Sequence, residues 1–204
     1  MATLIIDPEI EDRLRAERVE SGADRYDEVW EGTYMMAPMP NIEHQDLVNR
    51  LAAVFQETIG WPELGMVLPG CNVSDRKTDW HQNYRVPDVA VVLRESSAQN
   101  LDTHWYGGPD FVVEVVSPDD KSRETIPFYA GVGVRELLII DRNPWMLELY
   151  QLSGKQLKLT ASSVLPKSQI LTSQVLRFTF CLVAGDSRPR IQVRHAASEN
   201  EWLV

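Results

Sequence analysis

The chain has 204 residues, 44% of them hydrophobic, and its 30 acidic and 20 basic side chains give a net charge of −10. This size predicts one domain with a sizeable core, and the charge argues against a broad basic surface for nucleic acid or anionic lipid. Cys71 and Cys181 have neither disulfide-framework nor zinc-site spacing, and the N-terminus resembles no signal peptide. No stretch is long and apolar enough to span a membrane, so we expect a cytoplasmic protein.

The chain begins with a predicted surface helix. Residues 7–21 start with an Asp-Pro pair and carry apolar residues at a loosely helical spacing. We therefore expect an N-terminal helical extension over residues 1–24, followed by a single domain over residues 25–204.

A hairpin and a long helix are expected next. Residues 26–36 form two short extended runs around a turn at Glu31-Gly32. Asn41 can cap a helix whose wide apolar stripe ends near Gly60. The apolar side chains of the hairpin, with Trp30 among them, fit a homodimer interface and fit core packing equally well.

Short apolar runs then predict a central sheet, because runs such as VAVVL and FVVEVV are continuous, as in strands covered on both faces. The runs lie at residues 66–68, 89–93, 111–116, 137–140 and 147–152. A helical segment at residues 121–134 separates the third run from the fourth. Residues 74–84 are expected to be a polar loop. Further strands are expected at residues 174–183 and 190–193.

Two acidic residues interrupt this apolar pattern. Asp88 stands at the entrance to one strand, and Glu114 lies in the middle of another. A buried carboxylate needs a metal, a cation or a changed pKa. If the two strands are neighbours, both acids meet at the sheet edge, where they could hold Mg²⁺ or Mn²⁺. Alternatively, Asp88 caps a turn and Glu114 pairs with Arg85, Arg135 or another cation.

Several segments together resemble the Uma2 family, a domain of unknown function in the PD-(D/E)xK restriction-endonuclease-like superfamily. The segments are YDEVWEGTYMMAPMP, NIEHQDLVNRL, RVPDVAVVL, GGPDFVVEVVSPDD and IPFYAGVGVRELLIIDRNPWMLELYQL, and the likeness covers roughly residues 25–155. The resemblance implies an α/β fold with a central mixed sheet flanked by helices, here with extra C-terminal strands. It also implies a metal-dependent endonuclease acting on DNA.

The resemblance assigns roles to individual residues. Asp88 and Glu114 match the motif acids, and the main-chain carbonyl of Val115 is the expected third metal ligand. Cleft-lining roles fall on Glu31, His44, Gln45 and Thr125. Tyr129 also matches the family pattern and is most simply a packing residue with a polar tip.

The motif lysine is replaced in this chain. Val116 and Thr125 occupy the two positions where the family carries it. Lys121 precedes Thr125 by one helical turn and could orient the attacking water, if the segment is helical from about residue 120. Pro127 opposes an early helix start, and a solvated role for Lys121 is the alternative. Two hypotheses follow: an active nuclease, or a catalytically silent scaffold that serves as a binding protein.

Overall fold

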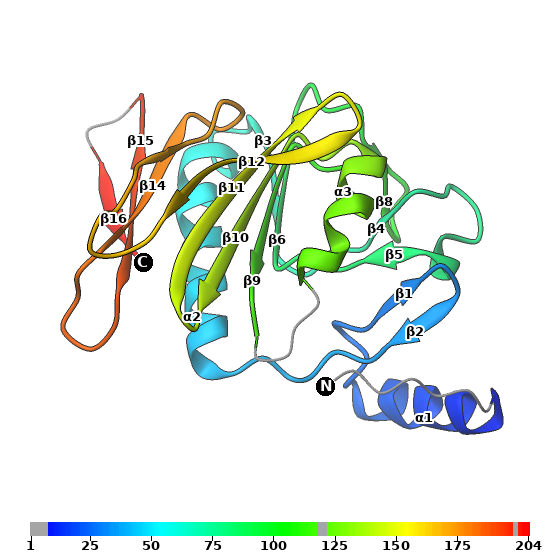
Figure 1. Cartoon of the computed structure of the whole chain (residues 1–204). Coiled ribbons are helices and arrows are strands. Elements are labelled where there is room, and N and C mark those ends of the chain that lie inside the picture. Colours follow the sequence, from blue (N-terminus) through cyan, green and yellow to red (C-terminus); the bar gives the residue numbers. More distant parts are fainter. Residues whose placement is uncertain (1–7, 118–121, 198–199) are drawn as a thin grey trace.

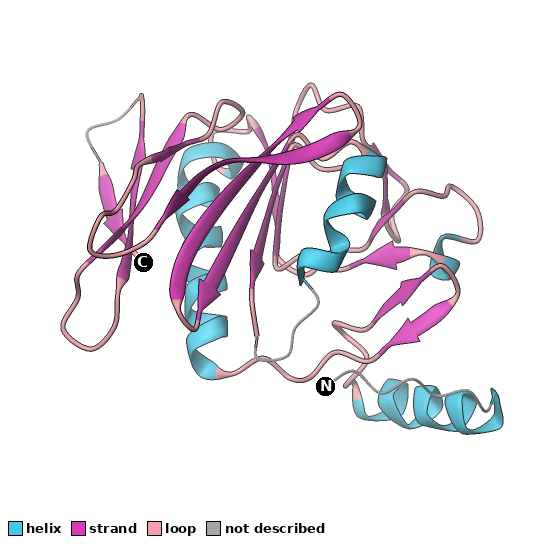
Figure 2. Cartoon of the chain, viewed as in Figure 1, coloured by secondary structure: helices cyan, strands magenta, loops and turns pink. Residues whose placement is uncertain are grey.

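The computed structural model describes residues 8–117, 122–197 and 200–204. A central sheet is covered by helix α2 (Ile42–Phe55) on one face and by α3 (Ile126–Val132) on the other (Figure 1). The C-terminal strands pack beside α2, and helix α1 (Pro8–Ser21) lies at the periphery (Figure 2). No helix among the described residues is long and apolar enough to span a membrane.

The central sheet is mixed and contains all five predicted apolar runs. Its order is β12-β11-β10-β9-β6-β3, in which β9 and β10 run parallel and the other neighbours run antiparallel. The strands are β3 (Gly65–Leu68), β6 (Val89–Leu93), β9 (Phe111–Val115), β10 (Glu136–Arg142), β11 (Trp145–Ser153) and β12 (Gln156–Ser163). The expectation that residues 89–93 and 111–116 are neighbours is confirmed, because β6 pairs with β9.

Helices on both faces explain why these strands are continuously apolar. Every residue of β9 is buried, and its odd-numbered side chains share a core with α2 and the C-terminal strands. Helix α2 begins after Asn41, whose side chain accepts the His44 N–H, and it continues as a π-helix at Gln56–Gly60. The other face packs against α3, which follows a 3-10 turn at Ser122–Thr125.

The helix therefore starts after Thr125, as expected from Pro127. The helical extension predicted to begin near residue 120 includes Lys121, which lies outside the described residues.

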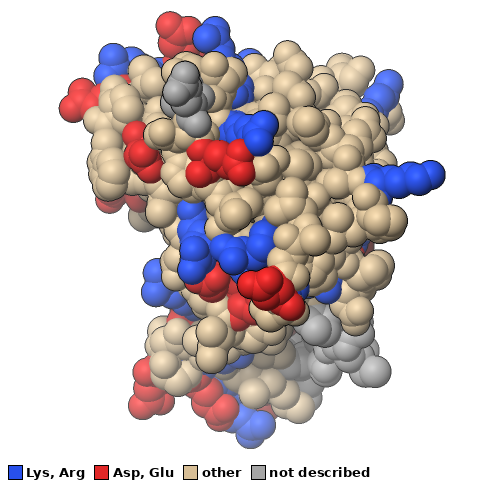
Figure 3. Space-filling model, turned by 90° about the vertical axis from the view of Figure 1, so that its left-hand side faces the viewer, with Lys and Arg blue, Asp and Glu red and all other residues tan. Residues whose placement is uncertain are grey.

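The C-terminal strands form a separate antiparallel sheet in the order β13-β14-β15-β16. They are β13 (Leu171–Thr172), β14 (Phe178–Val183), β15 (Arg190–His195) and β16 (Glu201–Leu203). Strand β14 starts later than predicted because Arg177 has a φ of 58°, which ends an extended run. On the face that carries this sheet, basic and acidic side chains are interspersed (Figure 3).

A third sheet joins the predicted hairpin to short strands, in the order β2-β1-β5-β4-β8-β7. The strands are β1 (Glu28–Trp30), β2 (Thr33–Met35), β4 (Val73–Ser74), β5 (Tyr84–Arg85), β7 (Gln99–Asn100) and β8 (Trp105–Tyr106). The predicted polar loop at residues 74–84 thus has a strand at each end and a 3-10 turn at Trp80–Gln82. These strands are too short and polar to show an apolar pattern.

Helix α1 is anchored to the hairpin by an ion pair. Arg18 donates to both carboxylate oxygens of buried Asp27, at 2.5 and 2.6 Å, and Tyr34 also donates to that carboxylate. Trp30 is half-buried and packs against Arg85. Association of two copies through the hairpin stays a prediction.

Candidate functional site

The two acids singled out from the sequence meet at one end of the central sheet. The register pairs Val89 with Val113, so extending the ladder by one residue sets Asp88 opposite Glu114. Asp88 Oδ2 accepts the N–H of Val115 at 2.7 Å. Directly opposed residues of an antiparallel pair have Cβ atoms about 5 Å apart. The strand register therefore sets the two acidic residues opposite each other at the end of β6 and β9.

His44 orients the Asp88 carboxylate from the first turn of α2. Its Nε2 lies 2.8 Å from Asp88 Oδ1, and its Nδ1 lies 3.3 Å from the hydroxyl oxygen of Ser117. An ionised carboxylate only accepts hydrogen bonds, so Nε2 donates to Asp88. His44 is buried, and its ring fixes the direction of Asp88 where the sequence suggested a cleft-lining side chain.

Tyr129 performs the same task for Glu114. The Tyr129 hydroxyl, on α3, donates to Glu114 Oε1 at 2.5 Å, and both side chains are buried. Burial, followed by the negative charge of Glu114, raises the pKa of Tyr129 well above its usual value. The phenol therefore keeps its proton and remains a donor to the carboxylate.

Glu28 on β1 brings a third carboxylate near this pair, and the sequence analysis did not single it out. Glu28 accepts the Val86 N–H at 2.8 Å and the Trp30 Nε1–H at 2.5 Å. Its charge also contributes to the raised pKa of Tyr129. The sequence pattern that could have identified Glu28 is its spacing from Trp30. The two residues are two positions apart in a short strand near the start of the predicted domain, so their side chains lie on the same face.

Arg85 is a buried cation between the hairpin and α3. Its guanidinium carbon lies 4.4 Å from the centre of the Trp30 ring and 4.2 Å from that of Phe128. Burial lowers the pKa of Arg85. Its ion-pair partner is Glu28, with Nε 4.0 Å from Oε2. Arg135, the other cation considered for Glu114, pairs with Asp110 at 3.0 Å.

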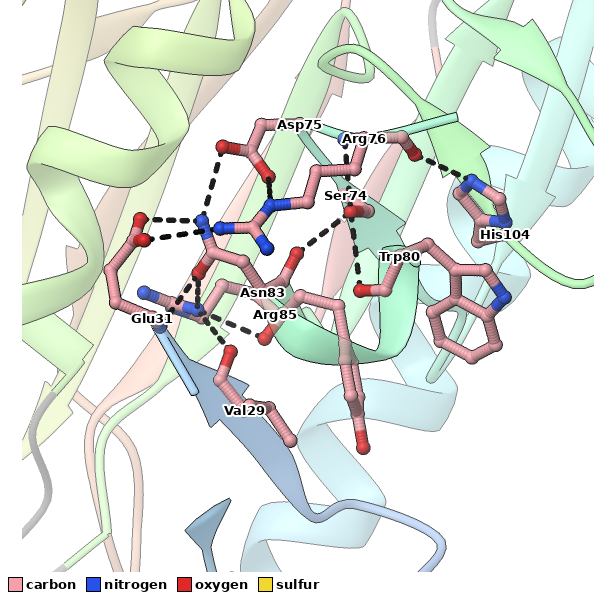
Figure 4. Close-up of polar contacts among 10 residues, drawn as sticks. Val29, Glu31, Ser74, Asp75, Arg76, Trp80, Asn83, Arg85 and His104 are labelled. Atoms are coloured by element: carbon pink, nitrogen blue, oxygen red, sulfur yellow. Dashed lines mark hydrogen bonds and ion pairs between the residues drawn. The ribbon is translucent and has the colours of Figure 1, made fainter. Parts of the chain in front are cut away.

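Glu31 lies in the hairpin turn and takes part in a polar network whose other members include buried Asn83 and Arg85 (Figure 4). It accepts from Asn83 Nδ2 at 2.7 Å and from Arg76 at 3.2 Å. Asn83 in turn accepts from Arg85 at 3.2 Å. Glu31 is thus linked to the buried cation through Asn83, while its own carboxylate stays in solvent.

Three further residues were predicted to line the site or bind the metal: Thr125, Gln45 and Val115. The Thr125 hydroxyl is buried and donates to the Ser122 carbonyl at 2.6 Å. Gln45 is half-buried on α2, and no hydrogen bond joins its side chain to the described residues. Val115 is buried, and its N–H points toward Asp88. The N–H and C=O of one strand residue point to the same side of the strand, so the Val115 carbonyl also faces Asp88.

The donor set fits a hard divalent cation. Two carboxylates and a main-chain carbonyl supply the oxygen ligands that Mg²⁺ prefers, with water completing the coordination. Within the described ranges, no group of three or more His, Cys, Asp and Glu side chains is arranged to hold a metal ion. A cation at this point would therefore depend on Asp88, Glu114 and the Val115 carbonyl.

Comparison with known proteins identifies the family and the fold of the chain. The model of the family Uma2, described as "Putative restriction endonuclease", matches residues 10–184. The crystal structure of a "putative nuclease belonging to DUF820" from Anabaena variabilis ATCC 29413 has a TM-score of 0.53 and 17% identity, covering 65% of this chain and 75% of that chain. At this identity the likeness shows the fold. No curated protein matches the chain. The chain belongs to the Uma2 family of restriction-endonuclease-like proteins.

Proposed function

We propose that this protein is an endonuclease that hydrolyses DNA phosphodiester bonds with Mg²⁺ or Mn²⁺. The observation that carries the proposal is the strand register, which sets Asp88 opposite Glu114 at the end of the paired strands β6 and β9. In this reading Asp88, Glu114 and the Val115 carbonyl hold the cation. The chemistry that a divalent cation supplies when bound is polarisation of the phosphate and activation of water.

The chain's own residues position these ligands. His44 holds Asp88 from α2, and Tyr129 holds Glu114 from α3, so the two helices on opposite faces of the sheet set the direction of the two acids. Hydrogen-bond partners of this kind fix the orientation of metal-binding side chains before the metal ion binds. On the resemblance to the motif, Lys121, which lies outside the described residues, is the residue that orients the attacking water.

The second candidate function is a silent scaffold that binds a partner without cleaving it. Val116 has no charge, and the Thr125 hydroxyl is engaged by a main-chain carbonyl, so neither replaces the lysine of the motif. A scaffold of this kind binds the metal through the two acids and does not cleave DNA.

Calorimetric titration with Mg²⁺ or Mn²⁺ tests the metal site. We expect binding to the native protein and loss of binding in Glu114→Gln. Glu148, on β11, is the matched control, because it has the same 8% exposure as Glu114 and pairs with Arg123 of the 3-10 turn. Glu148→Gln should bind the metal as the native protein does. Equal binding by the native protein and Glu114→Gln would refute the metal site.

Cleavage assays then separate the two functions. Single-stranded, duplex and branched DNA are incubated with the native protein and Mg²⁺, and with Lys121→Ala and Glu114→Gln. An endonuclease loses cleavage in Glu114→Gln. Metal binding without cleavage of any substrate identifies the scaffold. Full activity in Lys121→Ala would refute the role of that lysine and leave the acids in place.

A further inference from the structure

Strand β3 forms one outer edge of the central sheet. It pairs with β6 on one side, and no described strand pairs with it on the other. Exposed apolar side chains accompany this edge: Met66 on the strand is 45% exposed, Leu64 just before it is 55% exposed, and Trp61 in the preceding turn is 72% exposed. An open strand edge with apolar side chains beside it is a surface on which another strand can pair.

The main-chain groups of this strand point outward at alternate residues. The Leu64 carbonyl accepts the Arg94 N–H at 2.9 Å, so the main chain of Leu64 faces β6. Met66 follows two residues later and faces β6 as well. The N–H and C=O groups of Gly65 and Val67 are therefore directed away from β6, toward the outer side of the sheet.

The β3 edge carries no charged side chain that would keep it from pairing. Residues 64–68 read LGMVL. The charged residues that flank this edge are Glu63 before the strand and Arg94 after β6, and they pair with each other at 3.7 Å. The opposite edge of the sheet, β12, carries Lys158, and a lysine on an edge strand disfavours pairing with another chain. The two edges thus differ in the property that controls association.

We propose that β3 pairs antiparallel with β3 of a second copy of this chain, about a twofold axis at Met66. In this register Gly65 and Val67 of the partner subunit face each other and exchange hydrogen bonds in both directions. Met66 then faces its own counterpart, and Leu64 faces Leu68 of the partner subunit on the same face, so every cross-strand pair there is apolar. A second copy fits because a twofold rotation sets the outward donors of this edge opposite its own outward acceptors.

Sedimentation velocity of the native protein at about 100 μM tests the association, and we expect a dimer. Met66→Lys sets two like charges opposite each other at the axis, so the dissociation constant should rise at least about tenfold. Met39→Lys is the matched control, because Met39 is 72% exposed and lies outside β3. It should dimerise as the native protein does. Circular dichroism establishes whether each variant is folded.

A cysteine at the axis tests the register. Both native cysteines, Cys71 and Cys181, are first replaced by serine so that only the added thiol reacts. Residues that face each other in a non-hydrogen-bonded antiparallel pair have Cα atoms about 4.5 Å apart, a separation that a disulfide spans. Met66→Cys should therefore form a disulfide-linked dimer on mild oxidation, whereas Met39→Cys should stay largely unlinked.

The outcomes decide the inference without reference to DNA or metal, so it stands or falls apart from the proposed function. A native monomer at the tested concentration would overturn it. A dimer that persists in folded Met66→Lys would place the contact on another surface, such as the hairpin, and would overturn it as well. Equal linking of Met66→Cys and Met39→Cys would refute the register. If Met66→Lys does not fold, the disulfide experiment decides.

Discussion

Tyr129→Phe removes one hydroxyl from the centre of the site and leaves the packed ring in place. The hydroxyl donates to the Glu114 carboxylate at 2.5 Å, and Tyr129 has no exposed surface. A hydrogen bond to a charged group contributes about 1.5–3 kcal/mol, so the free energy of unfolding at neutral pH should fall by about that amount. For a domain of this size the melting temperature should fall by about 3–12 °C.

The same substitution should lose its effect at alkaline pH. The folded state raises the pKa of Tyr129 above its usual value, whereas the phenol of the unfolded chain ionises near pH 10. The stability that comes from this shift is complete below about pH 10 and is lost as the pH rises through the folded-state pKa. Between these two pKa values, the free energy of unfolding of the native protein should fall by about 1.4 kcal/mol per pH unit. Tyr129→Phe should lack this decrease.

Urea unfolding of both proteins at about pH 7, 9 and 11 measures this difference. Burial raises the pKa of Tyr84 to about 12, and this contribution cancels because both proteins contain Tyr84. Tyr106→Phe, at a half-buried tyrosine of β8, should change the free energy of unfolding by less than about 0.5 kcal/mol. Equal stability at pH 7, or a difference that stays constant up to pH 11, would refute the buried hydrogen bond.

Three further substitutions test the supports of the site and the fold. His44→Leu should weaken Mg²⁺ binding about 10- to 100-fold in calorimetry, because Asp88 loses the ring that orients it. Asn41→Ala should lower the free energy of unfolding in urea by about 0.5–2 kcal/mol, because it removes the cap of α2. Glu136→Ala should lower it by about 2–4 kcal/mol, because buried Glu136 accepts from Ser173 and from the Gln174 N–H, and these donors would lose their partner.

Each of these substitutions has a control nearby or of the same type. Gln45→Leu, in the same turn as His44, should keep the native Mg²⁺ affinity, and equal affinities for both variants would contradict the orienting role. Asn49→Ala on the exposed face of α2 should not destabilise the protein, in contrast to Asn41→Ala. Glu95→Ala, at an exposed position, should have little effect, and a similarly small effect of Glu136→Ala would show that its hydrogen bonds are replaced by water.

The sequence alone predicted the elements whose pattern repeats along the chain. The apolar stripe after Asn41 specified α2, and the continuous apolar runs specified β6 and β9, because side-chain burial follows the period of each element. Asp88 and Glu114 were identifiable for the same reason: a carboxylate in an apolar strand departs from the pattern. Short polar strands such as β4 and β5 were missed, because two residues define no period.

Only the tertiary structure decided which side chains meet these acids. His44 comes from α2 and Tyr129 from α3, and each reaches its carboxylate only because helices cover both faces of the sheet at the same end. Arg85 was one of the alternative partners considered for Glu114, and its position between two rings and beside Glu28 depends on how the hairpin packs against α3. Contacts between distant segments depend on which elements pack against each other, and the local periodicity of a segment does not specify its partners.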